Sequence, residues 1–525
     1  MVSFTLREEN WENFELVEDD IEFLYNYLLE LETPLTPTDL VSALAEERIQ
    51  REIREIEKQR TSGGDIYFPK ERYEVDQNLV FPAFDWQQGK VVEVRPGQNP
   101  DLAAFDIIKV QMDDGNEHEF ASGIEDHPLN EPPEIVQEDA LLDLQFVLNR
   151  YGDELEERLE QGLHDHPDFV RIAGRWFPRA LLIDVNVGHL NLAEAVLDME
   201  GGGPLSTPEL LEHVELPSNV NTKLVEFSLD LAMEEDERFD EVGPAGQILW
   251  HLKRLEPQEV LEKPIYLRYH EVDYDRSDMD SEMLILERDL DDELSPMEAR
   301  PVEEDEVVVR LIFPHWRAGT LPLSNRIQHL FPTAYETPRI RFVMVDGKTK
   351  NKFPGWVVRH KHYVYGLKEW YEEQGLIPGS FVRLGRGDQP GEVIVSSDAQ
   401  RSSRDWMRTL LVGSDGEVVF AMLKQIVSAA YDERMAIAIP DVDALDDVWK
   451  KLQKNRRPFE RILVDMVREL AKLNPQSHVH ASELYAAVNL VNRCPPGPIL
   501  SLLCSRPWFV HVGDMYYRFD DSEQG

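Results

Sequence analysis

Apolar residues recur at intervals of three and four near the start of the chain, and the interval changes to two further along. Ile21–Leu29 has the helical spacing, and a second helix is expected after Pro34, where Thr38 or Asp39 is suited to cap it. From these patterns we expect residues 1–62 to form a helical N-terminal region similar to a helix-turn-helix.

Short runs with alternating apolar residues follow between Tyr73 and Phe120. Such alternation predicts strands, and Asp113–Asn116 has the composition of a tight turn between the last two of them. We interpret residues 72–124 as a small antiparallel β-barrel of the SH3 type.

One construction then occurs three times: helices lead into an aromatic residue, an alternating strand and a glycine turn. The helical parts are Ala140–Leu163, Leu190–Met233 and Phe459–Leu503, and the tails are His166–Pro178, Asp236–Pro244 and Ser505–Phe519. Three helices followed by a two-stranded wing are the outline of a winged helix. The irregular spacing of the copies indicates domain duplication and not a solenoid. We therefore expect winged-helix-like domains at residues 132–185, 188–268 and 456–522.

These tails resemble the HARE-type helix-turn-helix modules of RNA polymerase delta subunits and some restriction enzymes. The second copy departs from that pattern, because Gly243–Gln247 lacks a closing aromatic strand. Several modules are acidic. Asp153, Glu154, Glu156, Glu157 and Glu160 follow one another on the predicted helix before the first tail, so we expect these copies to bind protein partners.

Charge separates two further regions. Residues 269–306 are strongly acidic, and we interpret them as a solvated linker, with a strand at Met283–Leu286 as the alternative. Arg310–Arg408 instead holds sixteen Lys and Arg against nine Asp and Glu, in a chain of net charge −47. Alternating patterns predict six strands in residues 307–400. Residues 404–455 are expected to form a helical connector.

The order of motifs in the basic region resembles the DNA-binding pseudobarrel of plant B-three transcription factors and of restriction-endonuclease effector domains. The resemblance depends on Gly319–Leu323, Ile340–Lys348, Trp356–Arg359, Tyr365–Trp370 and Gly375–Val382. Ser380 and Leu367 depart from the pattern, where Asp and Trp are usual. The resemblance implies that two loops, or arms, grip the major groove. The implied residues are Arg317, Thr320, Ser324, Asn325 and Arg326 in the first arm, and Arg359, Lys361 and Tyr363 in the second.

Other cations fit the same role on their chemistry alone, because Lys and Arg neutralise phosphates. Lys348, Lys350 and Lys352 alternate, which places them on one side of an extended segment. Arg456 and Arg457 end a basic cluster before the last winged helix. A solvated basic face without a ligand, or a face for protein or RNA, remains the alternative reading of this region.

Signals for chemistry are weak. Three His-x-His pairs, at residues 164/166, 360/362 and 478/480, each lack a third zinc ligand, and Cys494 and Cys504 form no metal motif. No phosphate-binding loop or nucleophile elbow is present. We therefore expect no enzymatic activity, metal, cofactor or small-molecule substrate.

The sequence thus predicts an α+β multidomain protein with winged-helix-like modules, an SH3-like barrel and a DNA-binding pseudobarrel. No apolar run approaches the length of a membrane span, so we expect no membrane partner and a cytoplasmic location. The favoured function is non-enzymatic binding of duplex DNA in transcription or defence. The alternative is an acidic scaffold that docks RNA polymerase or a nuclease without touching DNA.

Overall fold

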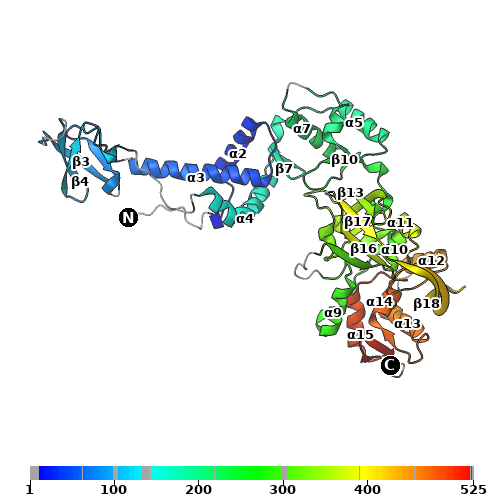
Figure 1. The fold of residues 1–525 in the computed structure, drawn as a ribbon. Coiled ribbons are helices and arrows are strands. Elements are labelled where there is room, and N and C mark those ends of the chain that lie inside the picture. Colours follow the sequence, from blue (N-terminus) through cyan, green and yellow to red (C-terminus); the bar gives the residue numbers. More distant parts are fainter. Residues whose placement is uncertain are drawn as a thin grey trace. The chain divides into compact units, whose positions relative to one another are not determined.

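The computed structural model is a mixed α and β structure, as predicted (Figure 1). It describes residues 11–61, 63–84, 86–98, 104–131, 141, 143–217, 220–296, 304–389, 391–414, 416–454, 457–520 and 522. The chain divides into two compact units. The first is Met1–Arg171 with Arg175–Leu182, and the second is Ile172–Gly174 with Ile183–Gly525. Among the described residues, no helix combines the length and the apolar character that crossing a bilayer requires.

The N-terminal module joins two regions that the sequence analysis kept apart. It consists of α2 (Glu18–Leu31), α3 (Pro37–Thr61), α4 (Leu144–His164), β6 (Phe169–Ile172) and β7 (Arg175–Pro178). Between α2 and α3, Leu35 pairs antiparallel with Trp176 of β7. Arg158 of α4 donates to the carbonyl of Phe14 over 3.0 Å. The boundary predicted between residues 1–62 and 132–185 is therefore wrong, because these contacts make one fold of both.

A five-stranded sheet is inserted between α3 and α4. Its strands are β1 (Asp65–Ile66), β2 (Asn78–Phe81), β3 (Gln87–Pro96), β4 (Asp106–Met112) and β5 (Glu117–Ser122), and they lie in chain order. The predicted turn joins β4 to β5. Tyr67, Phe81, Val91 and Ile108 are buried between the strands, which is the physical reason for the alternation in the sequence.

The central module consists of α5 (Val187–Met199), β8 (Leu205–Ser206), α6 (Thr207–Leu211), α7 (Thr222–Glu234), β9 (Phe239–Glu241) and β10 (Leu249–Leu252), with strand order β8–β10–β9. A closing aromatic strand was not expected here, because Gly243–Gln247 lacks one. β10 is that strand, and Trp250 within it is fully buried. The Trp250 indole donates to Asp230 over 2.9 Å, which satisfies a polar atom in the core.

The C-terminal module repeats this order of elements. It contains α13 (Phe459–Ala471), β20 (Val479–His480), α14 (Ala481–Val488), α15 (Pro496–Ser505), β21 (Phe509–Gly513) and β22 (Tyr516–Phe519), with strand order β20–β22–β21. The N-terminal module has the same succession, with the Leu35 bridge in the place of the first strand. The internal repetition predicted from the tails therefore extends to whole modules.

The basic region forms a curled sheet of seven strands. These are β11 (Glu306–Arg310), β12 (Thr320–Pro322), β13 (Arg339–Asp346), β14 (Lys352–Val358), β15 (Tyr363–Tyr365), β16 (Phe381–Arg386) and β17 (Glu392–Ser396), in the order β11–β16–β17–β13–β14–β15–β12. Two short helices, α10 (Phe313–Ala318) and α11 (Lys368–Glu373), accompany it. The six strands predicted from alternation are present, and β12 was not predicted.

The predicted helical connector at residues 404–455 is largely wrong. A long hairpin, β18 (Ala399–Val412) and β19 (Val418–Ala429), occupies its first part, and only α12 (Val442–Lys454) is helical. The chain forms strands here because apolar and β-branched residues lie on both sides of Gly413–Gly416, where the chain turns.

The acidic region is not a solvated linker in its described part. Ser281–Leu290 forms helix α9 and not a strand, and Met283 on it is buried. Asp292 and Glu293 follow in the interior, with side chains 0% and 3% exposed. These carboxylates are buried because a cation from the C-terminal module meets them, as described below.

Candidate nucleic-acid interface

The cation of the first predicted arm is held by a carboxylate of the same chain. Arg317 extends from α10, and its Nε and Nη2 donate to Asp446 of α12 over 3.1 and 2.6 Å. The guanidinium also lies 5.7 Å from the centre of the Tyr266 ring. Hydrogen bonding to Asp446 raises the pKa of Arg317 above its ordinary value. This bidentate pair uses the donors that a phosphate or a guanine base would need.

The remaining residues of the first arm also face protein atoms. Thr320 is fully buried, and its hydroxyl lies 2.8 Å from Nδ1 of His315. Ser324 is buried and donates to Asp291 over 2.7 Å. Asn325 accepts a hydrogen bond from Gln328 over 2.9 Å, and Arg326 lies 3.6 Å from Glu304.

Two residues of the second arm, Lys361 and Tyr363, contact the segment that follows the central module, while Arg359 bonds within the basic region. Arg359 donates to the carbonyl of Thr337 over 2.9 Å, and Lys361 donates to that of Leu261 over 2.7 Å. Tyr363 is 1% exposed and donates to the carbonyl of Glu259 over 2.6 Å. Burial lowers the pKa of Lys361. Both arms therefore join parts of the protein to one another.

The alternating lysines differ from the arms. Lys348 and Lys350 are exposed at the turn between β13 and β14, while Lys352 forms an ion pair with Glu392. Asp346 fixes the turn by accepting from the backbone N–H groups of Lys348 and Thr349. Arg457 is exposed and lies 3.9 Å from Asp465. Arg456 lies outside the described residues.

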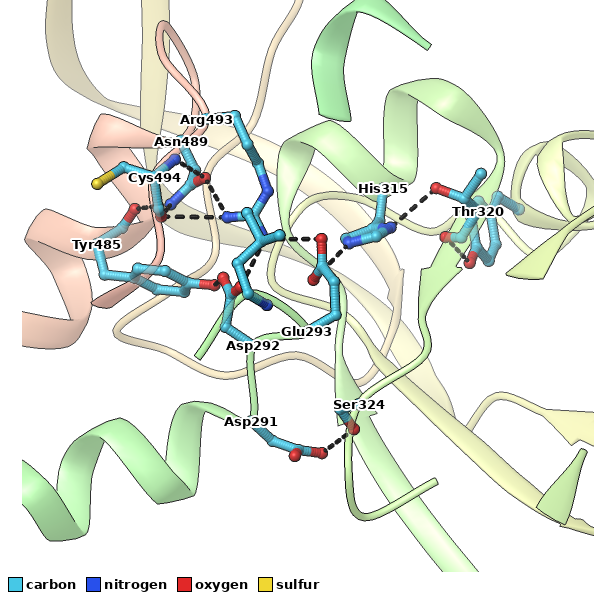
Figure 2. A network of polar contacts seen from close by, with 12 residues as sticks. Asp291, Asp292, Glu293, His315, Thr320, Ser324, Tyr485, Asn489, Arg493 and Cys494 are labelled. Carbon is cyan, nitrogen blue, oxygen red and sulfur yellow. Dashed lines mark hydrogen bonds and ion pairs between the residues drawn. The ribbon is translucent and has the colours of Figure 1, made fainter. Parts of the chain in front are cut away.

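Sequence reasoning missed a buried network of charges (Figure 2). Arg493 is fully buried, and its Nη2 donates to Asp292 over 2.6 Å and to Glu293 over 2.8 Å. Tyr485 donates to the other oxygen of Asp292 over 2.5 Å, and His315 lies 3.1 Å from Glu293. The residues come from the acidic region, α10 and the C-terminal module. No sequence signal marks this network, because an acidic run gives no sign of which carboxylates meet a distant arginine.

Burial alone raises the pKa of Glu293, but Arg493 and His315 outweigh it and hold that pKa well below its ordinary value. Glu293 is thus a buried carboxylate that the Arg493 guanidinium and the His315 ring both contact. A catalytic acid or base needs a pKa near the working pH and access to a substrate. The enclosed network, in which Arg493, Tyr485 and His315 contact the two carboxylates, has the properties of a structural core instead.

Surface chemistry gives no further candidate among the described residues. No three side chains of His, Cys, Asp or Glu are grouped there as metal ligands would be. A cleft of about 400 Å³ borders β14, β15 and α11, and its walls include Lys352, Tyr365 and Trp370.

Comparison with known proteins adds no assignment: no protein-family description, no curated protein and no solved structure matches this chain. Its function must therefore be inferred from its own residues.

Proposed function

We propose that this protein is a non-enzymatic docking scaffold, in which three winged-helix modules and a pseudobarrel bind protein partners. The observation that carries this proposal is that the described residues of both predicted DNA-gripping arms are held within the chain. Arg317 is paired with Asp446, and Lys361 with the Leu261 carbonyl. A hydrogen bond to a charged group contributes about 1.5–3 kcal/mol to the stability of the folded protein. Binding DNA with both arms would require several of these hydrogen bonds to be broken.

The third helices of two of the three modules support the same reading. In a winged helix or helix-turn-helix bound to DNA, the recognition helix enters the major groove. Here α4 carries five carboxylates between Asp153 and Glu160, which phosphate repels. The corresponding helix of the C-terminal module, α15, has Pro496–Ser501 and Leu503 buried. One of these helices has the wrong charge for DNA and the other lacks an open face.

Duplex DNA is the second candidate partner, through Lys348 and Lys350. These two lysines are exposed on the β13–β14 turn, and such cations contact backbone phosphates without reading sequence. This candidate predicts weak, salt-sensitive binding.

A titration of the full chain with labelled duplex DNA at low salt tests the docking function. We expect no binding above that of an acidic control protein. The double variant Arg359→Ala, Lys361→Ala should lower the melting temperature, since it removes the two contacts to Thr337 and Leu261. The matched variant Lys348→Ala, Lys350→Ala should melt like the parent, because both side chains are exposed.

The opposite pattern would refute the docking function. Affinity for DNA that falls with a log–log salt slope of about 0.9 per phosphate contacted, and that is weakened by the Arg359 and Lys361 substitutions, would assign the arms to DNA. Binding that depends only on Lys348 and Lys350 would favour the second candidate.

A further inference from the structure

The β18–β19 hairpin has one covered edge and one open edge. In the part of the chain that the structure describes, its sheet contains only these two strands. The outer edge of β18 is covered at Ala438, which donates to the carbonyl of Arg408 and accepts from the N–H of Leu410, both over 2.9 Å. Among the described residues, no strand pairs with the outer edge of β19.

The bonds to Ala438 fix which backbone groups point outward from β19. Arg408 and Leu410 direct their N–H and C=O groups away from β19, so they form the non-hydrogen-bonded pairs of the ladder. Their opposite residues are Met422 and Phe420. By alternation, Lys424 and Ile426 also present their backbone groups at the open edge, while the odd-numbered residues between them bond to β18.

This edge lacks the usual protection of an exposed strand. Natural edges are shortened, charged, kinked by a bulge or interrupted by proline. From Val418 to Val427 the pairing is regular, with no proline or glycine and a single charge, that of Lys424. Apolar side chains beside it are exposed, with Ile426 62%, Met422 40% and Leu423 37% accessible. The strand is thus suited to accept a further strand.

Charge identifies the kind of strand that fits. One face of the hairpin carries Arg404, Trp406 and Lys424 beside the apolar Met422 and Ile426. No carboxylate lies at the alternate positions that share this face. The Lys424 ammonium lies 5.3 Å from the centre of the Trp406 ring, which is 64% exposed. In a chain of net charge −47, such a cationic face favours an acidic ligand. A second copy would bring another Lys424 close to the first.

We propose that the open edge of β19 binds an acidic, extended segment of a partner protein as a third strand. Acidic side chains of that segment would lie beside Lys424, whose neighbour on the other side is Trp406, and apolar ones would pack on the opposite face beside Leu423. Backbone hydrogen bonds supply affinity in strand addition, and the alternating side chains supply specificity. The inference rests on the docking function and names the chemistry of the partner.

Titration of the full chain with two synthetic peptides of about ten residues tests this site, since strand addition uses short extended segments. One peptide alternates Glu with Val, and the other alternates Lys with Val. The Glu peptide should bind saturably and shift the Trp406 emission to the blue, as judged against a Trp406→Phe variant. Hydrogen exchange should slow at the amides of Met422, Lys424 and Ile426, and not at the alternating amides already bonded to β18.

Two substitutions should remove this binding by different routes. Lys424→Glu should weaken the Glu peptide at least tenfold and bring the Lys peptide to measurable affinity. Met422→Pro removes an outward N–H and spares the bonds to β18, so the peptide should no longer bind. Lys454→Glu makes the same charge change at an exposed position on α12 and should leave the affinity unchanged. Circular dichroism shows whether Met422→Pro folds. If it does not fold, the peptide affinities of Lys424→Glu alone test the proposed site.

Absence of peptide binding, or binding that survives both substitutions, overturns the proposal. Sedimentation that shows a dimer lost in Met422→Pro would assign the edge to a second copy and also overturn it. Single-stranded DNA competing for the same face would do the same. None of these outcomes changes the result expected from the duplex DNA titration. The docking function and the strand site can therefore be refuted independently of one another.

Discussion

Replacement of Arg493 by methionine tests the buried network most directly. Methionine is long and apolar, so it fills much of the same space without a charge. The change leaves Asp292 and Glu293 in the interior with their main counter-ion removed. It also removes the hydrogen bond that Arg493 Nη1 donates to Asn489 over 3.1 Å.

The size of the expected loss in stability follows from the burial of all three charges. Breaking a buried pair by removing one partner costs about 3–5 kcal/mol, because the remaining charge is uncompensated. At roughly 2 °C per kcal/mol for a large domain, the melting temperature should fall by about 6–10 °C. The uncharged triple variant Arg493→Met, Asp292→Asn, Glu293→Gln should recover most of this loss, since none of these three positions then carries a buried charge.

The loss should also depend on pH. In the parent, the pKa of Glu293 lies below its ordinary value, so its stabilising contribution is present at neutral pH and is lost as pH falls through the folded-state pKa. Without Arg493, burial dominates and the pKa of this carboxyl rises. A raised folded-state pKa gives stability that is lost as pH rises, so the variant should be less destabilised at pH 5 than at pH 8.

Thermal unfolding followed by circular dichroism at the two pH values measures both effects. A matched control is Arg457→Met, because that guanidinium is exposed, and it should melt like the parent. The reasoning fails if Arg493→Met melts with the parent, or if its destabilisation is equal at pH 5 and pH 8.

Three further substitutions test individual contacts. Burial raises the pKa of Asp230 to about 7, so its contribution to stability is present at low pH and is lost as pH rises towards 7. Asp230→Asn should therefore raise the free energy of unfolding in urea above pH 7. An unchanged free energy of unfolding above pH 7 would contradict the burial argument. Burial lowers the pKa of His480 to about 4, and its neutral Nδ1 caps α14 by accepting from the backbone N–H of Ser482. The protein should therefore lose stability as pH falls from about 6.5 towards 4. His480→Asn should make its stability less dependent on pH in this range. A double-mutant cycle of Arg317→Ala and Asp446→Ala should give a coupling of about 1 kcal/mol, and additive losses would show that the pair contributes nothing.

Periodicity in the sequence predicted those elements that bury a single face. β13 alternates because Ile340 and Met344 face the core while Arg341 and Val343 are less buried, and the same holds for β4. Periodicity did not predict the β18–β19 hairpin. Leu410 and Phe420 bury one face at its turn end, while Met407 and Val427 bury the other face further along, so apolar residues follow one another without a period.

Contacts between distant residues were beyond prediction for a different reason. The first two helices belong with α4 only because Leu35 pairs with Trp176 across an inserted sheet. The arm cations were recognised as cations, but their partners Asp446 and the Leu261 carbonyl lie in other elements. A single sequence shows which groups are charged. Which groups they meet is decided by packing.

The separation of Asp292 and Arg493 along the chain has a consequence for synthesis. The two residues that bond in the interior are 201 positions apart. At about 5–20 residues per second, the ribosome completes the carboxylates roughly 10–40 s before it makes their arginine. During that interval Asp292 and Glu293 must remain hydrated, so the last half of this protein closes only once its final module has emerged.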